Sequence, residues 1–242
     1  EAGTINIDGG TASLSSGLYF GGTSEPNQPT LNIQNGATVT GSGSTIASLP
    51  GDHATLNVTG AAGSQPSSLS LFNSTVAFRG TADFNVTAGG QVDIQAEAAL
   101  GGSTGADGSM LVSGVNGTMP STVDVTGPAA RIRVGISGAG SLTVENGGKV
   151  HSAGYVSVGE FGTGDGTITI GGHSGGFDAG LTADGNLYVG GGTTGAGGSG
   201  VINVNDDGYL FVSELTVYAG GEMHVDGGGT VTSTSTAVVN GG

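Results

Sequence analysis

The stretch from Leu142 to Ile170, LTVENGGKVHSAGYVSVGEFGTGDGTITI, holds short apolar segments separated by glycine-rich turns. Its first and last triplets, Leu142-Thr143-Val144 and Ile168-Thr169-Ile170, begin 26 residues apart, and Val156-Ser157-Val158 lies between them. In a strand, the two outer residues of each triplet point to one side and the middle residue to the other. The stretch therefore predicts one repeating unit of short β-strands joined by turns.

The same apolar–polar–apolar triplet recurs along the whole chain with a mean step of about 27 residues. Each unit also holds a second apolar segment, such as Leu187-Tyr188-Val189, and a weaker third one after the glycine turn, such as Val92-Asp93-Ile94. A unit of this size cannot bury its own apolar face, whereas coils stacked on one another can. The triplets begin at Ile5, Leu31, Leu56, Phe84, Met110, Leu142, Ile168, Ile202 and Met223.

We therefore predict that residues 1–242 form a single all-β domain, a right-handed parallel β-helix of about nine to ten coils with three short strands each. The alternative is a sandwich of hairpins, which would need strand partners adjacent in sequence and no fixed period. Helices are nearly excluded because glycine interrupts most segments. Only Gln95 to Leu100 has helical character, and it is too short to form a stable helix alone.

The composition of the chain narrows the classes of function. Its 242 residues include 53 glycines and no cysteine, and four Lys and Arg against 19 Asp and Glu give a net charge of −15. Without cysteine there are no disulfides or thiolate metal sites, and so few basic residues argue against nucleic acid as a partner. No apolar run reaches the length of a membrane-spanning helix. A glycine-rich acidic chain could be disordered, but its alternating Val and Ile favour strands.

The segments Leu142 to Val150 and Tyr155 to Ile168 resemble a repeat of bacterial surface proteins. The same form returns in Leu187-Tyr-Val-Gly-Gly-Gly and in Gly200-Val-Ile-Asn-Val-Asn-Asp-Asp-Gly, and the resemblance is clearest from Thr122 to Val231. Such repeats are found in autotransporter passenger domains and in related secreted proteins that carry a PEP-CTERM sorting signal. The resemblance implies a β-helix that is secreted or displayed on the bacterial cell surface. In those families adhesins, autoaggregation factors and surface fibres are common and enzymes are a minority.

Two sets of outward side chains are candidate sites. Asparagine recurs in the middle of several triplets, and we expect these amides to stack in a hydrogen-bonded ladder with a structural role. All five tyrosines are predicted to point outward, as a face for contact between molecules or for stacking on sugars. Tyrosine as a strand-favouring surface residue is the alternative. The asparagines are Asn6, Asn32, Asn57, Asn85 and Asn203, and the tyrosines are Tyr19, Tyr155, Tyr188, Tyr209 and Tyr218.

No cofactor is expected. Asp165 and the run Asn205-Asp206-Asp207 offer oxygen ligands for structural Ca²⁺, but the nonapeptide of calcium-loaded β-rolls is absent, which favours solvated turn residues. Four histidines occupy unrelated positions in the repeat and show no metal-ligand spacing; they are His53, His151, His173 and His224.

Catalysis is the less favoured prediction. Asp124, Arg131 and Arg133 come closest to the carboxylate and basic groups that polysaccharide-cleaving β-helices use. Two arginines and an aspartate in adjacent strands more often form a surface salt bridge. We therefore expect no catalytic residues.

The repeat begins at Ile5 and its last apolar segment reaches Val239. Open coils expose strand edges and core, which predicts either a piece of a longer rod or copies that stack head to tail into a filament. The favoured hypothesis is an extracellular structural or adhesive module, a surface fibre subunit with itself or cell-surface glycans as partners. A carbohydrate-active enzyme and a passive stalk are the alternatives.

Overall fold

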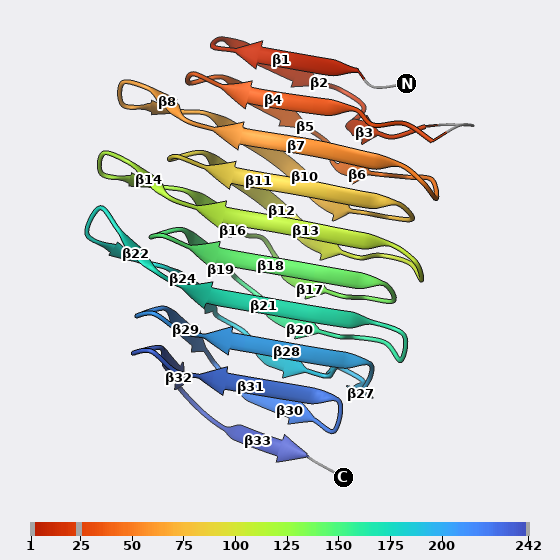
Figure 1. The fold of residues 1–242 in the computed structure, drawn as a ribbon, viewed down its shortest axis with the longest axis vertical. Helices are drawn as coiled ribbons and strands as arrows, with labels where there is room; N and C mark the ends of the chain where they lie inside the picture. Colours follow the sequence, from red (N-terminus) through yellow and green to blue (C-terminus); the bar gives the residue numbers. More distant parts are fainter. Residues whose placement is uncertain (1–2, 23–25, 241–242) are drawn as a thin grey trace.

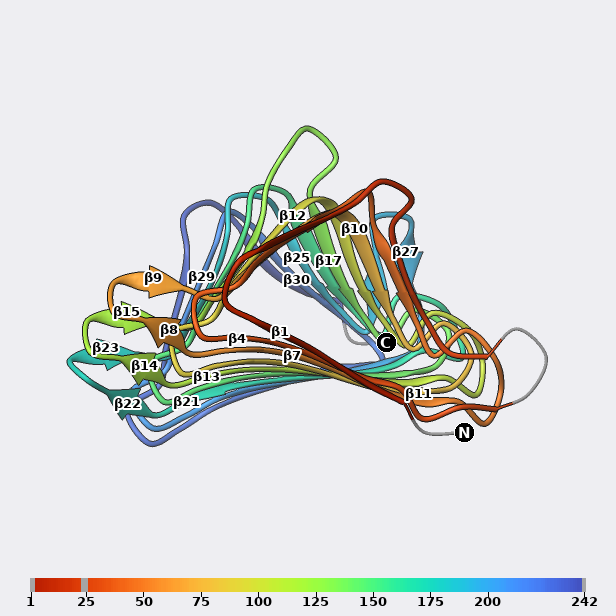
Figure 2. The ribbon, with the colours of Figure 1, turned by 90° about the horizontal axis from the view of Figure 1, so that it is seen from above.

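The computed structural model describes residues 3–22 and 26–240, which form only strands and turns. Strands of successive coils lie one above the other, so the molecule is a rod with the N-terminus at one end and the C-terminus at the other (Figure 1). Viewed along the rod, the coils enclose a three-sided section (Figure 2). The predicted all-β parallel solenoid is therefore confirmed.

The first side, here called the anchor sheet, consists of the triplet strands, each pairing in parallel with the next. In its register Leu142 lies between Met110 and Ile168, as the repeat requires. Nine stacked strands correspond to about eight turns, close to the predicted nine to ten coils. The strands are β1 (Thr4–Asp8), β4 (Thr30–Gln34), β7 (His53–Thr59), β11 (Thr81–Thr87), β13 (Asp107–Ser113), β18 (Ala139–Glu145), β21 (Asp165–Gly171), β28 (Ser199–Val204) and β31 (Gly221–Val225).

The second and third sides are also parallel ladders, and β10 (Ser68–Val76) and β12 (Gln91–Leu100) run through both. Gln95 to Leu100, the segment with helical character, thus lies in a strand. The second side includes β2 (Thr11–Leu14), β5 (Thr38–Gly41), β16 (Thr122–Val125), β19 (Lys149–Ser152), β24 (Gly180–Ala183), β29 (Tyr209–Val212) and β32 (Thr230–Ser233). The third includes β3 (Leu18–Phe20), β6 (Ser44–Ile46), β17 (Arg131–Val134), β20 (Tyr155–Val158), β25 (Leu187–Val189), β30 (Leu215–Tyr218) and β33 (Ala237–Asn240).

Short antiparallel hairpins project from the corners between these sides. Three lie at the corner between the anchor sheet and the second side, on every other coil from the third to the seventh (Figure 2). The buried Ser121 at the base of one accepts a hydrogen bond from the Gly89 N–H of the preceding coil at 3.0 Å. A fourth hairpin follows β25. The four are β8 (Ala61–Ala62) with β9 (Gln65–Pro66), β14 (Val115–Asn116) with β15 (Met119–Pro120), β22 (His173–Ser174) with β23 (Phe177–Asp178), and β26 (Gly191–Gly192) with β27 (Gly195–Ala196).

Inward side chains from all three sides form one apolar core that runs along the rod. Phe84 and Ile168, on different coils, are both completely buried, and each such side chain contributes about 1.5–3 kcal/mol through its burial. Glycine serves this core as well as the corners. Gly166 points inward near the start of β21, where a Cβ atom would overlap the Val134 carbonyl oxygen and lie 2.6 Å from the Gly159 nitrogen. The interpretation of glycine as a corner residue was therefore incomplete.

Asp52 joins the corner segments of the first two coils. Its side chain is buried, and its carboxylate accepts hydrogen bonds from the backbone N–H groups of Leu49 at 2.8 Å, Asn27 at 2.9 Å and Gly22 at 3.1 Å. Gly22 and Asn27 belong to the first coil, and Leu49 belongs to the second. The carboxylate therefore links the first two coils at this corner, as hydrogen bonds between paired strands link the coils elsewhere in the rod.

Candidate functional site

Four of the predicted asparagines stack on the outer surface of the anchor sheet. The side-chain amide of Asn32 donates to the Oδ1 atom of Asn6 at 2.7 Å. Asn57 donates to Asn32 at 2.7 Å, and Asn85 donates to Asn57 at 2.9 Å. Because each amide is engaged by its neighbours along the rod, this ladder supports the stacking of the first four coils.

Asn203 lies outside this ladder. Its neighbours on the adjacent strands are Thr169 and His224. Beyond Asn85 the equivalent position is occupied by Leu111, which has no amide to continue the chain of hydrogen bonds. The inclusion of Asn203 in a five-residue ladder was therefore wrong.

Three of the five tyrosines meet on the third side. The ring centroids of Tyr155 and Tyr188 are 6.1 Å apart in an edge-on arrangement, and those of Tyr188 and Tyr218 are 6.5 Å apart and stacked. Such pairs add about 0.5–1.5 kcal/mol each to the packing of neighbouring coils. The three residues, here called the tyrosine cluster, lie on β20, β25 and β30.

The remaining two tyrosines do not join the tyrosine cluster. Tyr209 lies on the second side, where the Lys149 ammonium is 4.6 Å from its ring centroid. Tyr19 lies on the third side in the first coil, and its side chain is 78% exposed. The predicted single face of five tyrosines is therefore divided between two sides of the rod.

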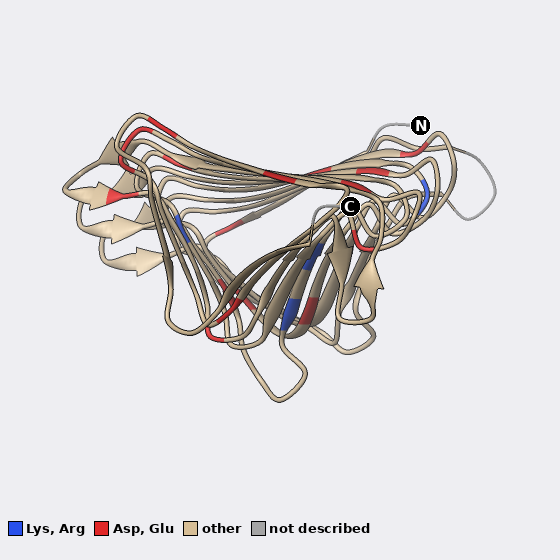
Figure 3. Cartoon of the chain, turned by 90° about the horizontal axis from the view of Figure 1, so that it is seen from below, with Lys and Arg blue, Asp and Glu red and all other residues tan. Residues whose placement is uncertain are grey.

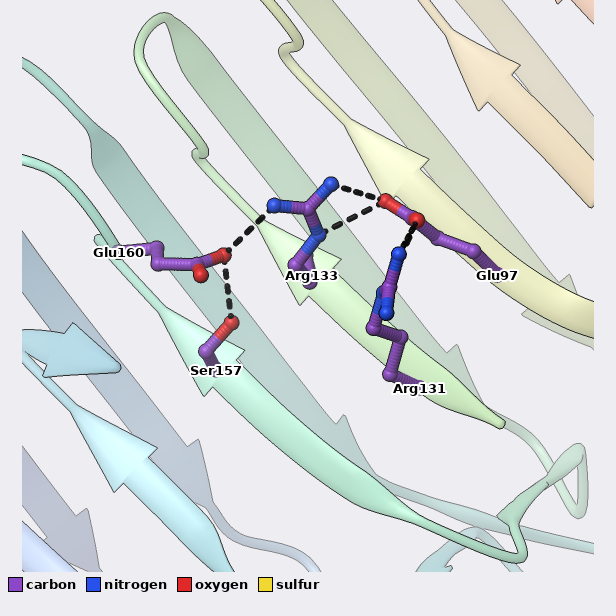
Figure 4. Close-up of polar contacts among 5 residues, drawn as sticks. All are labelled: Glu97, Arg131, Arg133, Ser157 and Glu160. Atoms are coloured by element: carbon purple, nitrogen blue, oxygen red, sulfur yellow. Dashed lines mark hydrogen bonds and ion pairs between the residues drawn. The ribbon is translucent and has the colours of Figure 1, made fainter. Parts of the chain in front are cut away.

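Figure 4 shows a network of ion pairs on the third side. It lies next to the tyrosine cluster, because Arg131 is the register partner of Tyr155. Glu97 of β12 accepts hydrogen bonds from the guanidinium groups of both Arg131 and Arg133 of β17. Arg133 also donates to Glu160 at 3.2 Å, and the same carboxylate accepts a hydrogen bond from Ser157. Two glutamates thus balance two arginines in one small area of the third side, where blue and red segments adjoin in Figure 3.

The network shifts the ionisation of two of its neighbours. Burial lowers the pKa of Arg133, but its hydrogen bonds and charge interactions with Glu97 and Glu160 outweigh this and raise the pKa above its usual range. Burial raises the pKa of Tyr155, and the nearby charge of Glu160 adds to that effect. Arg133 therefore stays charged and Tyr155 stays neutral at neutral pH.

Asp124 does not belong to this network. It lies on β16, on the second side, whereas both arginines lie on β17 beyond the next corner. The Asp124 carboxylate instead lies 3.6 Å from the Nδ1 atom of His151. The expected salt bridge between Asp124 and the arginines was wrong, because the chain turns a corner between these strands.

The second side carries its own group of ionisable residues. Asp93 lies directly opposite Asp124 in parallel register, and Asp124 lies opposite His151. His151 also approaches Asp184 at 3.3 Å. Burial raises the pKa of Asp93, and the charge of Asp124 raises it further.

Replacing Asp93 with asparagine should stabilise the protein at pH 7 by less than about 1 kcal/mol, since the site is partly exposed. Because the pKa of Asp93 is raised in the folded state, its ionised carboxylate destabilises the fold. This destabilisation is absent below the ordinary aspartate pKa and develops as the pH rises through the folded-state pKa. Melting temperatures at pH 7 and pH 3 should therefore show the gain only at pH 7. Asp165→Asn is the control, because Asp165 faces Ala139 and Ser199. A gain of equal size at both pH values would contradict the assignment.

The residues considered for metal binding lie apart. Asp165 begins β21, whereas Asp206 and Asp207 form the corner after β28 with backbone φ angles of 46° and 62°. Three histidines pair with single carboxylates, namely His53 with Asp83, His173 with Asp178 and His224 with Glu222. Within residues 3–22 and 26–240, no group of three or more His, Asp or Glu side chains is placed to hold a metal ion.

Comparison with known proteins finds no match between this chain and a protein-family model, a curated protein or a solved structure. In the part of the chain that the structure describes, no helix is long and apolar enough to cross a membrane.

Proposed function

We propose that this chain is an extracellular structural or adhesive module that joins further copies of itself, end to end, into a surface fibre. The observation that supports the proposal is the parallel register that the nine strands of the anchor sheet keep along the rod, because the same pairing can continue between copies. Ile5 is 60% exposed, whereas Leu31, its partner in the next coil, is 2% exposed. Val239 is 77% exposed, whereas its partner Val217 is 8% exposed.

The stacking inside the rod defines how a second copy would continue it. The β31 strand of one copy would pair with β1 of the next, which places Met223 beside Ile5 because both occupy the same position of the repeat. The same register places Val239 beside Phe20. A cavity of about 440 Å³ at the N-terminal end is lined in part by Ile5, Leu18 and Phe20. Apolar surface buried there would contribute about 25 cal/mol per Å² before the cost of association.

The alternative functions make different demands on the molecule. A polysaccharide-degrading enzyme would need acid and base groups that converge on a substrate, and the residues first considered for that role, Asp124 with Arg131 and Arg133, lie on two different sides. A passive stalk would have the same rod shape but would not need to assemble. Assembly is therefore the property that separates the proposed function from its alternatives.

Val239→Asp should raise the protein concentration needed for fibre formation at least tenfold, because it places a charge at the apolar junction. Val238→Asp is the matched control, since Val238 faces outward opposite Thr216 on the same strand. Sedimentation velocity and electron microscopy over a concentration series would measure the effect. A parent protein that stays monomeric at all concentrations, or equal loss in both variants, would contradict the proposal.

A further inference from the structure

A polar pocket of about 220 Å³ opens on the third side near the N-terminal end of the rod. Tyr19 of β3, Thr45 of β6 and Asn73 of β10 line it, so three successive coils each contribute one side chain. Gly17, Ser42, Gly43 and Ser44 complete the lining. The lining residues belong to the described part of the chain and include no charged side chain.

Asn73 reaches this pocket from the corner at which β10 passes from the second side to the third. Leu71 pairs with Gly41 of β5 and Ser74 pairs with Ser44 of β6, so Phe72 and Asn73 lie between the two ladders. Both are exposed, although alternation within one strand would point one of them inward. The corner therefore leaves the Asn73 side chain on the outer surface.

The floor of the pocket depends on a glycine. A Cβ atom on Gly43 would overlap the Asn73 side-chain oxygen. The missing side chain therefore leaves room for the asparagine amide and for anything that binds above it.

The polar groups of the pocket have hydrogen-bonding capacity to spare. Elsewhere on the rod, stacked polar side chains pair with one another, as the hydroxyls of Thr87 and Thr59 do at 3.0 Å. The side chains of Tyr19, Thr45 and Asn73 make no hydrogen bond to the residues that the structure describes. The pocket thus combines an exposed aromatic ring with amide and hydroxyl groups available to a ligand.

We propose that this pocket binds one neutral sugar residue of a cell-surface glycan. A pyranose ring has an apolar C–H face that can contact Tyr19 and hydroxyl groups that can bond to Thr45 and Asn73. A ligand with a negative charge is disfavoured because the pocket contains no cation and the chain carries a net charge of −15. The inference rests on the adhesive part of the proposed function, and it does not require that fibres form.

Saturation-transfer NMR with the methyl glycosides of glucose, galactose, mannose and N-acetylglucosamine would test the proposal, with glucuronate as the charged probe. At least one neutral glycoside should bind. Tyr19→Ser should weaken that binding about tenfold, and Asn73→Ala should weaken it about threefold to tenfold through the lost hydrogen bonds. Gly43→Ala should also weaken it by displacing the asparagine amide.

Phe72→Ser is the matched control, because Phe72 is an exposed aromatic residue next to Asn73 that does not line the pocket. Binding of none of the neutral glycosides, preference for glucuronate, or equal loss in Phe72→Ser would overturn the proposal. Circular dichroism would show that each variant is folded. Sedimentation of Asn73→Ala distinguishes the two proposals, since loss of sugar binding with fibres intact concerns the pocket alone.

Discussion

Asp52→Ala should lower the free energy of unfolding of the first two coils by about 3 kcal/mol. The buried carboxylate accepts three backbone hydrogen bonds, and hydrogen bonds to a charged group contribute about 1.5–3 kcal/mol each, part of which water would restore. Asp52→Asn keeps the shape and one acceptor oxygen, so its effect should be about half as large. Because a solenoid unfolds by nearest-neighbour steps, the loss should be local.

Amide hydrogen exchange would measure this effect coil by coil. Protection should fall in β1, β4 and the neighbouring strands of the first coils, while β18 and β21 should keep their parent values. Asp178→Ala is the control, because Asp178 is an exposed hairpin residue whose carboxylate pairs with His173, and such pairs contribute about 0–1 kcal/mol. A uniform loss of protection along the whole rod would show that the coils unfold as one unit.

Gly166→Val should destabilise the coils around β21 by about 3 kcal/mol. The first atom of the new side chain would lie 2.6 Å from the Gly159 nitrogen and 2.8 Å from a Val158 methyl group, so the corner and the strand would have to separate. Overpacking of this kind costs about 1–3 kcal/mol. The cost is expected at the upper end here because the nearest atoms include backbone, which cannot rotate away.

Thr167→Val is the matched control for this prediction. It introduces the same side chain one residue along β21, where it points outward, and the expected change is within about 0.5 kcal/mol. Thermal unfolding followed by circular dichroism would compare the two variants with the parent. If Gly166→Val melts within a few degrees of the control, the tight contact between the β21 strand and its corner would be refuted.

The fold could be predicted from the sequence because the repeat is carried by the positions that face the core. The first and third residues of each triplet must be apolar in every coil, so the pattern of one coil predicts the pattern of the next. Outward residues obey no such rule, which is why a ladder that was expected to reach Asn203 ends at Asn85. Whether an outward side chain forms a hydrogen bond with the next coil depends on which residue occupies the equivalent position there.

The residues that sequence reasoning missed act across large sequence separations. Glu97 lies 34 residues before Arg131, in a segment whose composition suggested a helix turn. Asp52 follows Pro50 and Gly51, a setting typical of an exposed turn, yet it is almost completely buried. The triplets of these two coils begin 26 residues apart, at Phe84 and Met110, so their spacing would place Glu97 beside Val123 rather than Arg131. Nothing in the local sequence marks Asp52 as buried.

The direction of the backbone hydrogen bonds has a mechanical consequence. Because strands pair with the coils above and below, these bonds run along the rod, and tension between its two ends loads the coils in series. Each coil adds about 4.8 Å to the rod, yet its 26 or so residues extend to about 90 Å once released. Under tension, a rod of this kind would lengthen in steps as its coils unfold one after another. It would therefore yield to an applied force rather than transmit it rigidly.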